Sequence, residues 1–464
     1  MLKDDFNIRQ RENKVIILFI SVFALFFGWQ GNFEGGDIAA ARRSFLGVAP
    51  IDLWGSFSGL FYGLIPNQPI PWGMYLYLFQ ILLTTLSLVG MQKIFIMSNN
   101  VLPRLSFYIF SYIFLCFSTT LTRDSTMATF VIFGISIILN NSNLQKPSAF
   151  KYCLAIIFIS TGISFRPWLA PIVLIIIFFL VKKNQSKYLV ILLTFLGLSL
   201  PFISNNSVYT FTNIKKVYPE LQVLIQDGGS IACLSSYEKS RIEATEFLNF
   251  FNGSSYSNAE ICKNYRLNTW TTLGNWQMRY QEAGLNREPK PDYNDKRTPI
   301  IFINTSLSSE RYGEIRSSWE VLISSNPKEY FRIKFIEFNQ LLLLGDTSQL
   351  LFLNELKKTD NSSVKSVVAA IFFMPWDLFI YFHLLAPLPI VLFFCTLVIF
   401  FSRGNTIISV VKNKNFVFSN LFMIIYLILS TLAYIGDTGR YMYLPSLIYW
   451  YFMSISLKKK AYDK

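Results

Sequence analysis

About ten stretches of this chain are apolar over the length that a helix needs to cross a bilayer, roughly 20 residues, and this limits the fold more than any other feature. Apolar residues make up 52% of the sequence, which excludes a soluble enzyme. We therefore expect an all-α polytopic membrane protein. The predicted spans are residues 14–30, 73–92, 105–121, 126–140, 152–165, 167–181, 188–204, 386–402, 416–434 and 440–457.

Lysine and arginine are unevenly divided between the two ends of these spans. The two tails and every second connection contain most of the lysines and arginines of the short segments. In the connections on the opposite side, the basic residues are all arginines. Because basic segments stay in the cytoplasm, both termini are predicted to be cytoplasmic and the first span to be a signal anchor. The arginines expected on the outer side are Arg42, Arg43, Arg123, Arg166 and Arg440.

The net charge of +14 follows from this topology. The excess cations are spread thinly over the cytoplasmic connections and tails and are not gathered in one patch, which argues against nucleic acid as a partner. The expected surroundings are the lipid bilayer of a bacterial cytoplasmic (inner) membrane.

A polar region separates the seventh and eighth predicted spans. Residues 205–365 have nearly balanced charge and are long enough to form a small core of their own, so we expect a mixed or mainly helical extracytoplasmic domain there. The membrane modules on either side are then residues 1–204 and 366–464. Cys233 and Cys262 lie in this domain, and they form either a disulfide in an oxidising compartment or two unlinked thiols.

The apolar stretch 366–385 is interrupted by Pro375 and contains Asp377 and His383. If it crossed the membrane as a full span, the basic C-terminal tail would end outside. We therefore expect a helix at the outer interface, anchored by Trp376.

The first outer loop, residues 31–72, contains two acidic residues among glycines. Glu34 and Asp37 follow the first span, and a carboxylate there could act as general base on a sugar hydroxyl. The alternative is that Asp37 caps the helix that begins at Ile38. The aromatic remainder of the loop predicts short amphipathic helices on the membrane surface.

Three outer turns carry the other arginines. In the turn T-R-D-S, Arg123 precedes Asp124, and Asp124 or Ser125 could instead cap the following helix. In S-F-R-P-W, Pro167 can open a helix and Trp168 marks the interface, while Arg166 could simply extend to lipid headgroups. In the last turn, G-D-T-G-R-Y, Asp437 could pair with Arg440.

Arginines that converge on one bilayer face are suited to hold the phosphate of a lipid-linked donor, since the guanidinium group binds phosphate oxygens in pairs. A nearby carboxylate completes what glycosyl transfer needs, because the lipid phosphate leaves with its charge stabilised and the acceptor hydroxyl loses a proton. A single displacement would invert the anomeric carbon. The candidate phosphate ligands are Arg123, Arg166, Arg440, Arg42 and Arg43, and the candidate substrate contacts are Tyr441, Trp168, His383 and Asp377.

These motifs together resemble the GT-C class of polytopic glycosyltransferases. The resemblance rests on the acidic first outer loop, the R-D-S and R-P turns, and a late R-Y-x-x-x-P formed by Arg440, Tyr441 and Pro445. The segment 318–335 is also similar to an amphipathic stretch that precedes the later spans in such enzymes. The resemblance implies a polyprenyl-phosphate sugar donor, a glycan or lipid-linked acceptor, and catalytic carboxylates at Asp37, Asp124 and Glu34. A divalent metal at Asp37 and Asp124 is left open.

Two other functions fit part of the pattern. A polysaccharide polymerase of the O-antigen type also has many spans, essential outer arginines and a polyprenyl diphosphate substrate. A transporter or lipid flippase should show internal repeats and ionisable residues at mid-depth in its spans. No such repeat is visible in this sequence, and the spans are nearly free of charge.

Overall fold

The structure is a computed structural model of the whole chain. It describes residues 2–27, 38, 41–42, 46, 56–92, 101–181, 185–211, 218, 221–253, 255–263, 265, 308–343, 374–375, 398, 413–432 and 443–456. Every regular element within these residues is a helix, which confirms the prediction of an all-helical chain.

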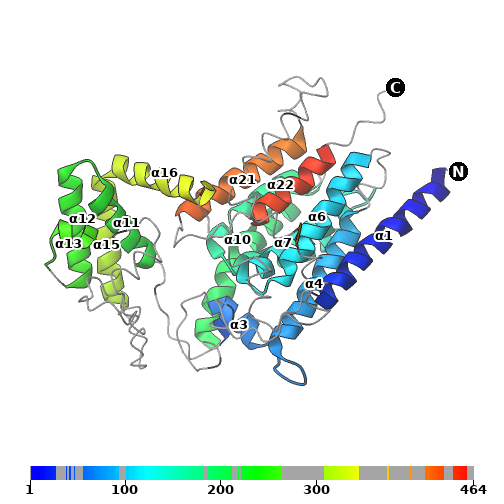
Figure 1. Cartoon of the computed structure of the whole chain (residues 1–464), viewed down its shortest axis with the longest axis horizontal. Coiled ribbons are helices and arrows are strands. Elements are labelled where there is room, and N and C mark those ends of the chain that lie inside the picture. Colours follow the sequence, from blue (N-terminus) through cyan, green and yellow to red (C-terminus); the bar gives the residue numbers. More distant parts are fainter. Residues whose placement is uncertain are drawn as a thin grey trace.

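The helices form two groups (Figure 1). The first group is an apolar bundle made of α1 (Leu2–Phe27), α3 (Ser56–Gly63), α4 (Trp72–Met91), α6 (Val101–Thr119), α7 (Arg123–Ser142), α8 (Ala149–Ser164), η1 (Pro167–Leu169), α9 (Ile172–Leu180), α10 (Lys187–Phe211), α21 (Lys414–Leu432) and α22 (Tyr443–Ser456). The second group, which we call the helical domain, is made of α11 (Leu221–Leu234), α12 (Glu238–Asn252), α13 (Asn258–Lys263) and α15 (Ser309–Ser325). Each group has its own hydrophobic core, and α16 (Pro327–Leu343) runs between them.

Four helices of the described chain are long and apolar enough to cross a membrane, namely α4, α7, α10 and α21. Three shorter helical stretches, 149–164, 167–180 and 221–234, are also apolar. Nine of the predicted spans fall on described helices, whereas the span 386–402 and the interfacial helix 366–385 lie almost wholly outside the described residues. The chain is therefore built for a bilayer environment.

Helices α7 and α8 form the antiparallel hairpin at the centre of the bundle. They approach closely because two glycines face the partner helix: a Cβ atom on Gly134 would lie 2.6 Å from the Ala155 carbonyl oxygen, and one on Gly162 would lie 2.9 Å from that of Met127. Small residues let helix backbones meet in this way inside membranes. The hairpin brings the beginning of α7 beside the end of α8, so that residues far apart in sequence share one end of the bundle.

The short helix α3 and the long helix α10 pack at the same end. Phe165, just after α8, contacts the rings of Phe57 and Phe61 on α3, with ring centroids 5.2 and 5.3 Å apart. The Asn205 amide on α10 donates to the Ser164 carbonyl at 2.9 Å. We call this meeting point of α3, α7, α8, η1 and α10 the Arg166 end.

Side chains from all four helices of the helical domain form its hydrophobic core. Ile225, Phe247, Ile261 and Ile315 are among its buried core residues. The structure joins Cys233 on α11 to Cys262 on α13 by a disulfide, the pairing that the sequence allowed. The expected boundary at residue 204 falls inside α10, because this helix continues to Phe211.

Candidate functional site

A buried ion pair lies at the centre of the Arg166 end. Nε and one terminal nitrogen of Arg166 donate to Asp124 Oδ1 at 3.1 and 2.9 Å, and the same terminal nitrogen donates to Oδ2 at 3.2 Å. Both residues are only 2% exposed. A bidentate pair of this kind is strong and fixes the plane of the guanidinium group. The structure thus joins two residues that the sequence placed in separate turns.

Asp124 does not cap α7, although its position made that an alternative. The cap is Thr122, whose hydroxyl accepts from the Ser125 backbone N–H at 3.1 Å, while the Ser125 hydroxyl accepts from the Thr122 backbone N–H at 3.1 Å. This reciprocal capping box satisfies the backbone N–H groups of Thr122 and Ser125. The carboxylate of Asp124 is therefore directed to Arg166.

The residues that follow Arg166 in the turn S-F-R-P-W also fix the position of its side chain. Arg166 itself is not helical, with φ −145° and ψ 70°, and Pro167 opens the short helix η1, as its position predicted. The guanidinium carbon lies 5.3 Å from the centre of the Trp168 ring. This cation–π contact and the Asp124 carboxylate hold the side chain in one place.

Arg123 adjoins the pair in sequence and is 7% exposed. It begins α7, so it lies at the helix end where backbone N–H groups point outward and where the helix dipole favours an anion. Two arginines and one aspartate, all buried, thus occur within the turns that meet here. Their summed formal charge is positive, which suits an anionic ligand.

Arg42 contacts the end of α3, the residues just after it and the first residue of α4. Its Nε donates to the Tyr62 carbonyl at 3.1 Å and its Nη2 to the Ile65 carbonyl at 3.2 Å, and its guanidinium carbon lies 5.1 Å from the Trp72 ring centre. Partial burial lowers the pKa of Arg42 from its ordinary value. These contacts indicate a structural role in addition to the phosphate contact that the sequence suggested.

Uncharged polar residues that the sequence did not single out join α3 and α4 to α7. The Tyr62 hydroxyl donates to Thr126 Oγ1 at 3.2 Å, and the Gln80 amide donates to the same oxygen at 2.6 Å. All three residues are fully buried. Gln80 is a polar residue in the middle of a predicted span, and this was the one sequence signal that could have pointed to it.

A second set of polar contacts ties α10 to the turn before Arg166. The Ser204 hydroxyl donates to the Ser164 hydroxyl at 2.9 Å, and Asn205 Oδ1 accepts from the Phe57 backbone N–H at 3.2 Å. Asn205 therefore contacts both α3 and the end of α8. Movement of α10 would disturb the position of Arg166 through these bonds.

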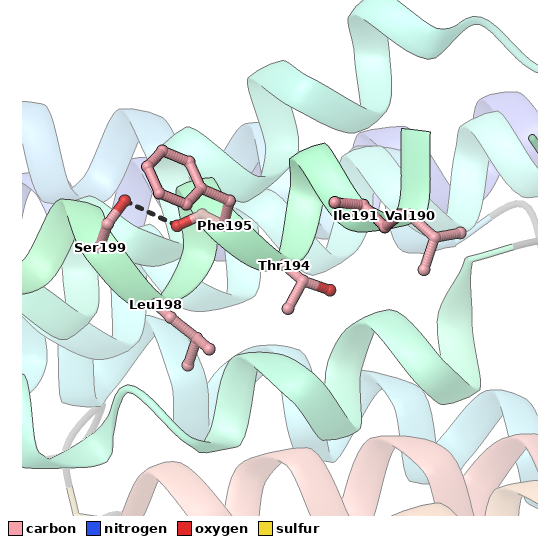
Figure 2. A pocket seen from close by; sticks show the side chains of 6 residues that line it. All are labelled: Val190, Ile191, Thr194, Phe195, Leu198 and Ser199. Carbon is pink, nitrogen blue, oxygen red and sulfur yellow. Dashed lines mark hydrogen bonds between the residues drawn. The ribbon is translucent and has the colours of Figure 1, made fainter. Parts of the chain in front are cut away.

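The outer surface of α10 carries an apolar hollow of about 490 Å³ (Figure 2). It is lined by Val190, Ile191, Thr194, Phe195, Leu198 and Ser199. The Ser199 hydroxyl donates to the Phe195 carbonyl of the same helix at 2.6 Å (Figure 2). None of these six lining residues is charged, so this surface of α10 suits a hydrocarbon chain.

Several predicted site residues fall outside the described residues. These are Glu34, Asp37, Arg43, Asp377, His383, Arg440 and Tyr441. Among the residues that the structure does describe, no three His, Cys, Asp or Glu side chains gather into a metal-binding group. The described site therefore consists of Arg123, Asp124, Arg166 and Trp168. Arg42 bonds to Tyr62, whose hydroxyl contacts Thr126 on α7.

The helical domain contains a separate buried ionic cluster that sequence reasoning missed. The Lys334 ammonium on α16 lies 2.7 Å from Asp227 Oδ1 on α11 and 2.8 Å from Glu337 Oε2, and all three side chains are nearly or fully buried. Burial raises the pKa of Asp227, and it raises that of Glu337 to about 7, although Lys334 opposes both shifts. Burial alone would lower the pKa of Lys334, but the two carboxylates raise it above its ordinary value.

No protein-family model, no curated protein and no solved structure matches this chain.

Proposed function

We propose that this protein is an integral membrane glycosyltransferase that moves a sugar from a polyprenyl-phosphate donor to a glycan or lipid-linked acceptor on the outer face of the cytoplasmic membrane. The observation that carries the proposal is the Arg166–Asp124 pair, buried beside Arg123 where α7 begins and α8 ends. Buried arginines at the end of an apolar bundle are suited to a phosphate that is itself anchored in the bilayer.

In this proposal, Arg123 and the start of α7 receive the donor phosphate. Asp124 and Trp168 hold Arg166 in a fixed orientation, so little rearrangement is needed when negative charge develops on the leaving phosphate. A preorganised cation is worth more in such a dry site than in water. Arg440 adds a further cation from the last outer turn.

In this proposal, the lipid part of the donor binds along α10. This helix is apolar, little of its surface is buried, and the described residues that line its hollow of about 490 Å³ are uncharged. The far part of the same helix reaches the Arg166 end through Ser204 and Asn205. A prenyl chain on α10 would therefore lead toward the arginines.

The chemistry is a single displacement. The acceptor hydroxyl oxygen bonds to the anomeric carbon of the sugar as the bond from that carbon to the phosphate oxygen breaks. Asp37 takes the hydroxyl proton as general base, and the lipid phosphate leaves with both electrons of the broken bond. Transfer by this route inverts the anomeric configuration.

The test of the base is Asp37→Asn in the purified full chain, assayed for transfer from a polyprenyl-phosphate sugar. We expect transfer to be lost while donor binding is kept, because the carboxylate acts on the acceptor. Near-normal turnover would remove Asp37 from this role.

The test of the phosphate site is Arg123→Gln, with Arg440→Ala as a second variant. Each should raise the apparent donor constant, because each loses a cation from the phosphate site. Arg316→Ala is the matched control, since Arg316 is an exposed arginine paired with Glu320 on α15. If neither variant changes the donor constant relative to this control, the phosphate assignment is wrong.

Comparison of cells with and without the protein separates the functional classes. Loss of a side-branch sugar from the surface polysaccharide is expected for the transferase. Loss of chain length would favour a polymerase, and an unchanged polymer would favour transport or another lipid-linked reaction.

A further inference from the structure

Two phenylalanines project from the exposed face of α16. Phe331 is 70% exposed and Phe335 is 64% exposed, although both are large and apolar. They are one helical turn apart, so they lie on the same side of the helix. The cationic residue Lys328 is exposed on the same side, one turn before Phe331. This arrangement of aromatic and basic residues is typical of helices that lie in a membrane interface.

The opposite face of α16 is fixed to the helical domain. Ile333 belongs to the core of that domain and is fully buried. Lys334 is held between Asp227 on α11 and Glu337 on α16 itself, at 2.7 and 2.8 Å. Arg332 adds a hydrogen bond to the Leu234 carbonyl at the end of α11. The helix therefore cannot turn its phenylalanines inward without breaking a buried ionic cluster.

The row of phenylalanines continues into the apolar bundle. Phe338 is three residues beyond Phe335, on the same side of the helix, and it packs against the core of the bundle. Figure 1 shows α16 running from the helical domain to α21, one of the four helices able to cross a membrane. The exposed pair thus extends a contact surface whose other end is already in apolar surroundings.

We propose that Phe331 and Phe335 form a lipid-contacting surface that seats the helical domain on the bilayer. The occupant of this surface is the lipid of the membrane that surrounds the bundle, with Lys328 near its phosphate groups. The continuity with Phe338 favours lipid over a protein partner, because the same row of side chains leads directly into the apolar bundle. The inference does not depend on the proposed transferase activity.

Photocrosslinking tests this surface in the full-length chain. Benzoylphenylalanine replaces Phe331 or Phe335 in protein held in nanodiscs of phosphatidylethanolamine and phosphatidylglycerol, and adducts are identified by mass spectrometry after irradiation. Phe250 on α12 is the matched control, since it is a phenylalanine of the same domain that is 42% exposed. Phe178 on α9 is the reference for direct lipid contact, because it is 74% exposed on the apolar bundle.

We expect phospholipid adducts at positions 331 and 335 in yields close to those at 178 and several-fold above those at 250. Lipid adducts no more frequent than at 250 would overturn the proposal. Adducts to peptides of this chain, to a second copy or to another protein would also overturn it, since they would identify a different occupant. All four positions are exposed, so the substitutions leave the two hydrophobic cores intact.

Discussion

Arg166 and Asp124, 42 positions apart in sequence, share a bidentate ion pair in which the shortest distance is 2.9 Å and both side chains are almost fully buried. Removal of either partner would leave the other charge buried and uncompensated, which is strongly destabilising even where the intact pair itself adds little stability. The pair also ties the beginning of α7 to the turn after α8. Its integrity is therefore expected to matter for stability as well as for ligand binding.

Asp124→Ala should destabilise the protein by about 3–5 kcal/mol, because it leaves the Arg166 charge buried without its carboxylate. Arg166→Ala should have a similar effect for the converse reason. The double variant should lose less stability than the sum of the losses in the two single variants, since it removes both charges. Thermal unfolding of the purified protein in detergent measures each effect.

Arg316→Ala serves as the control for this cycle. Arg316 is paired with Glu320 at 2.9 Å, but both side chains are more than half exposed, so no measurable change in the unfolding temperature is expected. Strictly additive losses in the Asp124 and Arg166 variants would contradict direct coupling between the two residues.

A methyl group on Gly134 should disturb the central hairpin. Its Cβ would lie 2.5 Å from Ile159 Cγ1 and 2.6 Å from the Ala155 carbonyl oxygen, and a backbone atom cannot move aside without shifting α8. We expect Gly134→Ala to destabilise the protein by about 1–3 kcal/mol, as overpacking of a close interface does. Because the turn with Arg166 directly follows α8, the transfer activity that we propose should fall as well.

Gly313→Ala is the matched control, since Gly313 also lies within a helix but a Cβ there would meet nothing within 4 Å. Alanine favours the helix over glycine by up to about 1 kcal/mol, so this variant should be neutral or slightly more stable. Equal destabilisation by the two substitutions would show that the contact between α7 and α8 is not the cause, because helix propensity alone favours alanine at both positions.

Much of the apolar bundle could be predicted from sequence, because hydrophobic length and turn chemistry are local properties. The predicted span 126–140 lies inside α7, which begins three residues earlier, at Arg123, after its Thr122 cap. Pro167 correctly marked the beginning of a new helical segment after Arg166. The alternation of spans also placed Arg123, Asp124 and Arg166 on one side of the membrane, which is consistent with their meeting at one end of the bundle.

Other features depend on contacts between residues that are far apart in sequence. The hydrophobic pattern of the sequence does not predict such contacts. The run Ser204, Asn205, Asn206 and Ser207 reads as the end of a span, yet α10 continues through it. Ser204 and Asn205 stabilise that continuation by bonding back to the Pro201 carbonyl and across to Ser164. The pairing of Asp227 with Lys334 likewise arises only when α16 packs on α11.

The disulfide should stabilise the helical domain. Cys233 and Cys262 are 29 positions apart, and closing a loop of that length stabilises a fold by about 3–4 kcal/mol through the unfolded chain. Non-reducing mass spectrometry of the protein should find the two peptides linked. Cys233→Ser should then lower the unfolding temperature of the domain, and Cys153→Ser in the apolar bundle is the control. Two free thiols in protein from an oxidising compartment would contradict the pairing.

The buried ionic cluster should make the helical domain less stable as the pH rises toward 8. Burial raises the pKa of Glu337 to about 7 from its usual value of 4.5, so the folded state holds a proton that the unfolded chain has released. The stabilisation from the protonated form is complete below about pH 4.5 and is lost as the pH rises through about 7. Hydrogen exchange of α11 and α16, corrected for the intrinsic pH dependence of exchange, should therefore be slowest at the acidic end.

Two variants identify the group responsible for this pH dependence. Glu337→Gln should remove most of it, because the amide accepts from Lys334 but does not titrate, whereas Glu320→Gln on the exposed face of α15 should leave it unchanged. Asp227→Asn should move the transition to lower pH, because the charge of Asp227 is one cause of the raised pKa of Glu337. In this variant Glu337 would also be the only carboxylate of the cluster in contact with Lys334. An unchanged transition in Asp227→Asn would mean that the two carboxylates titrate independently, in conflict with their shared contact to one ammonium group.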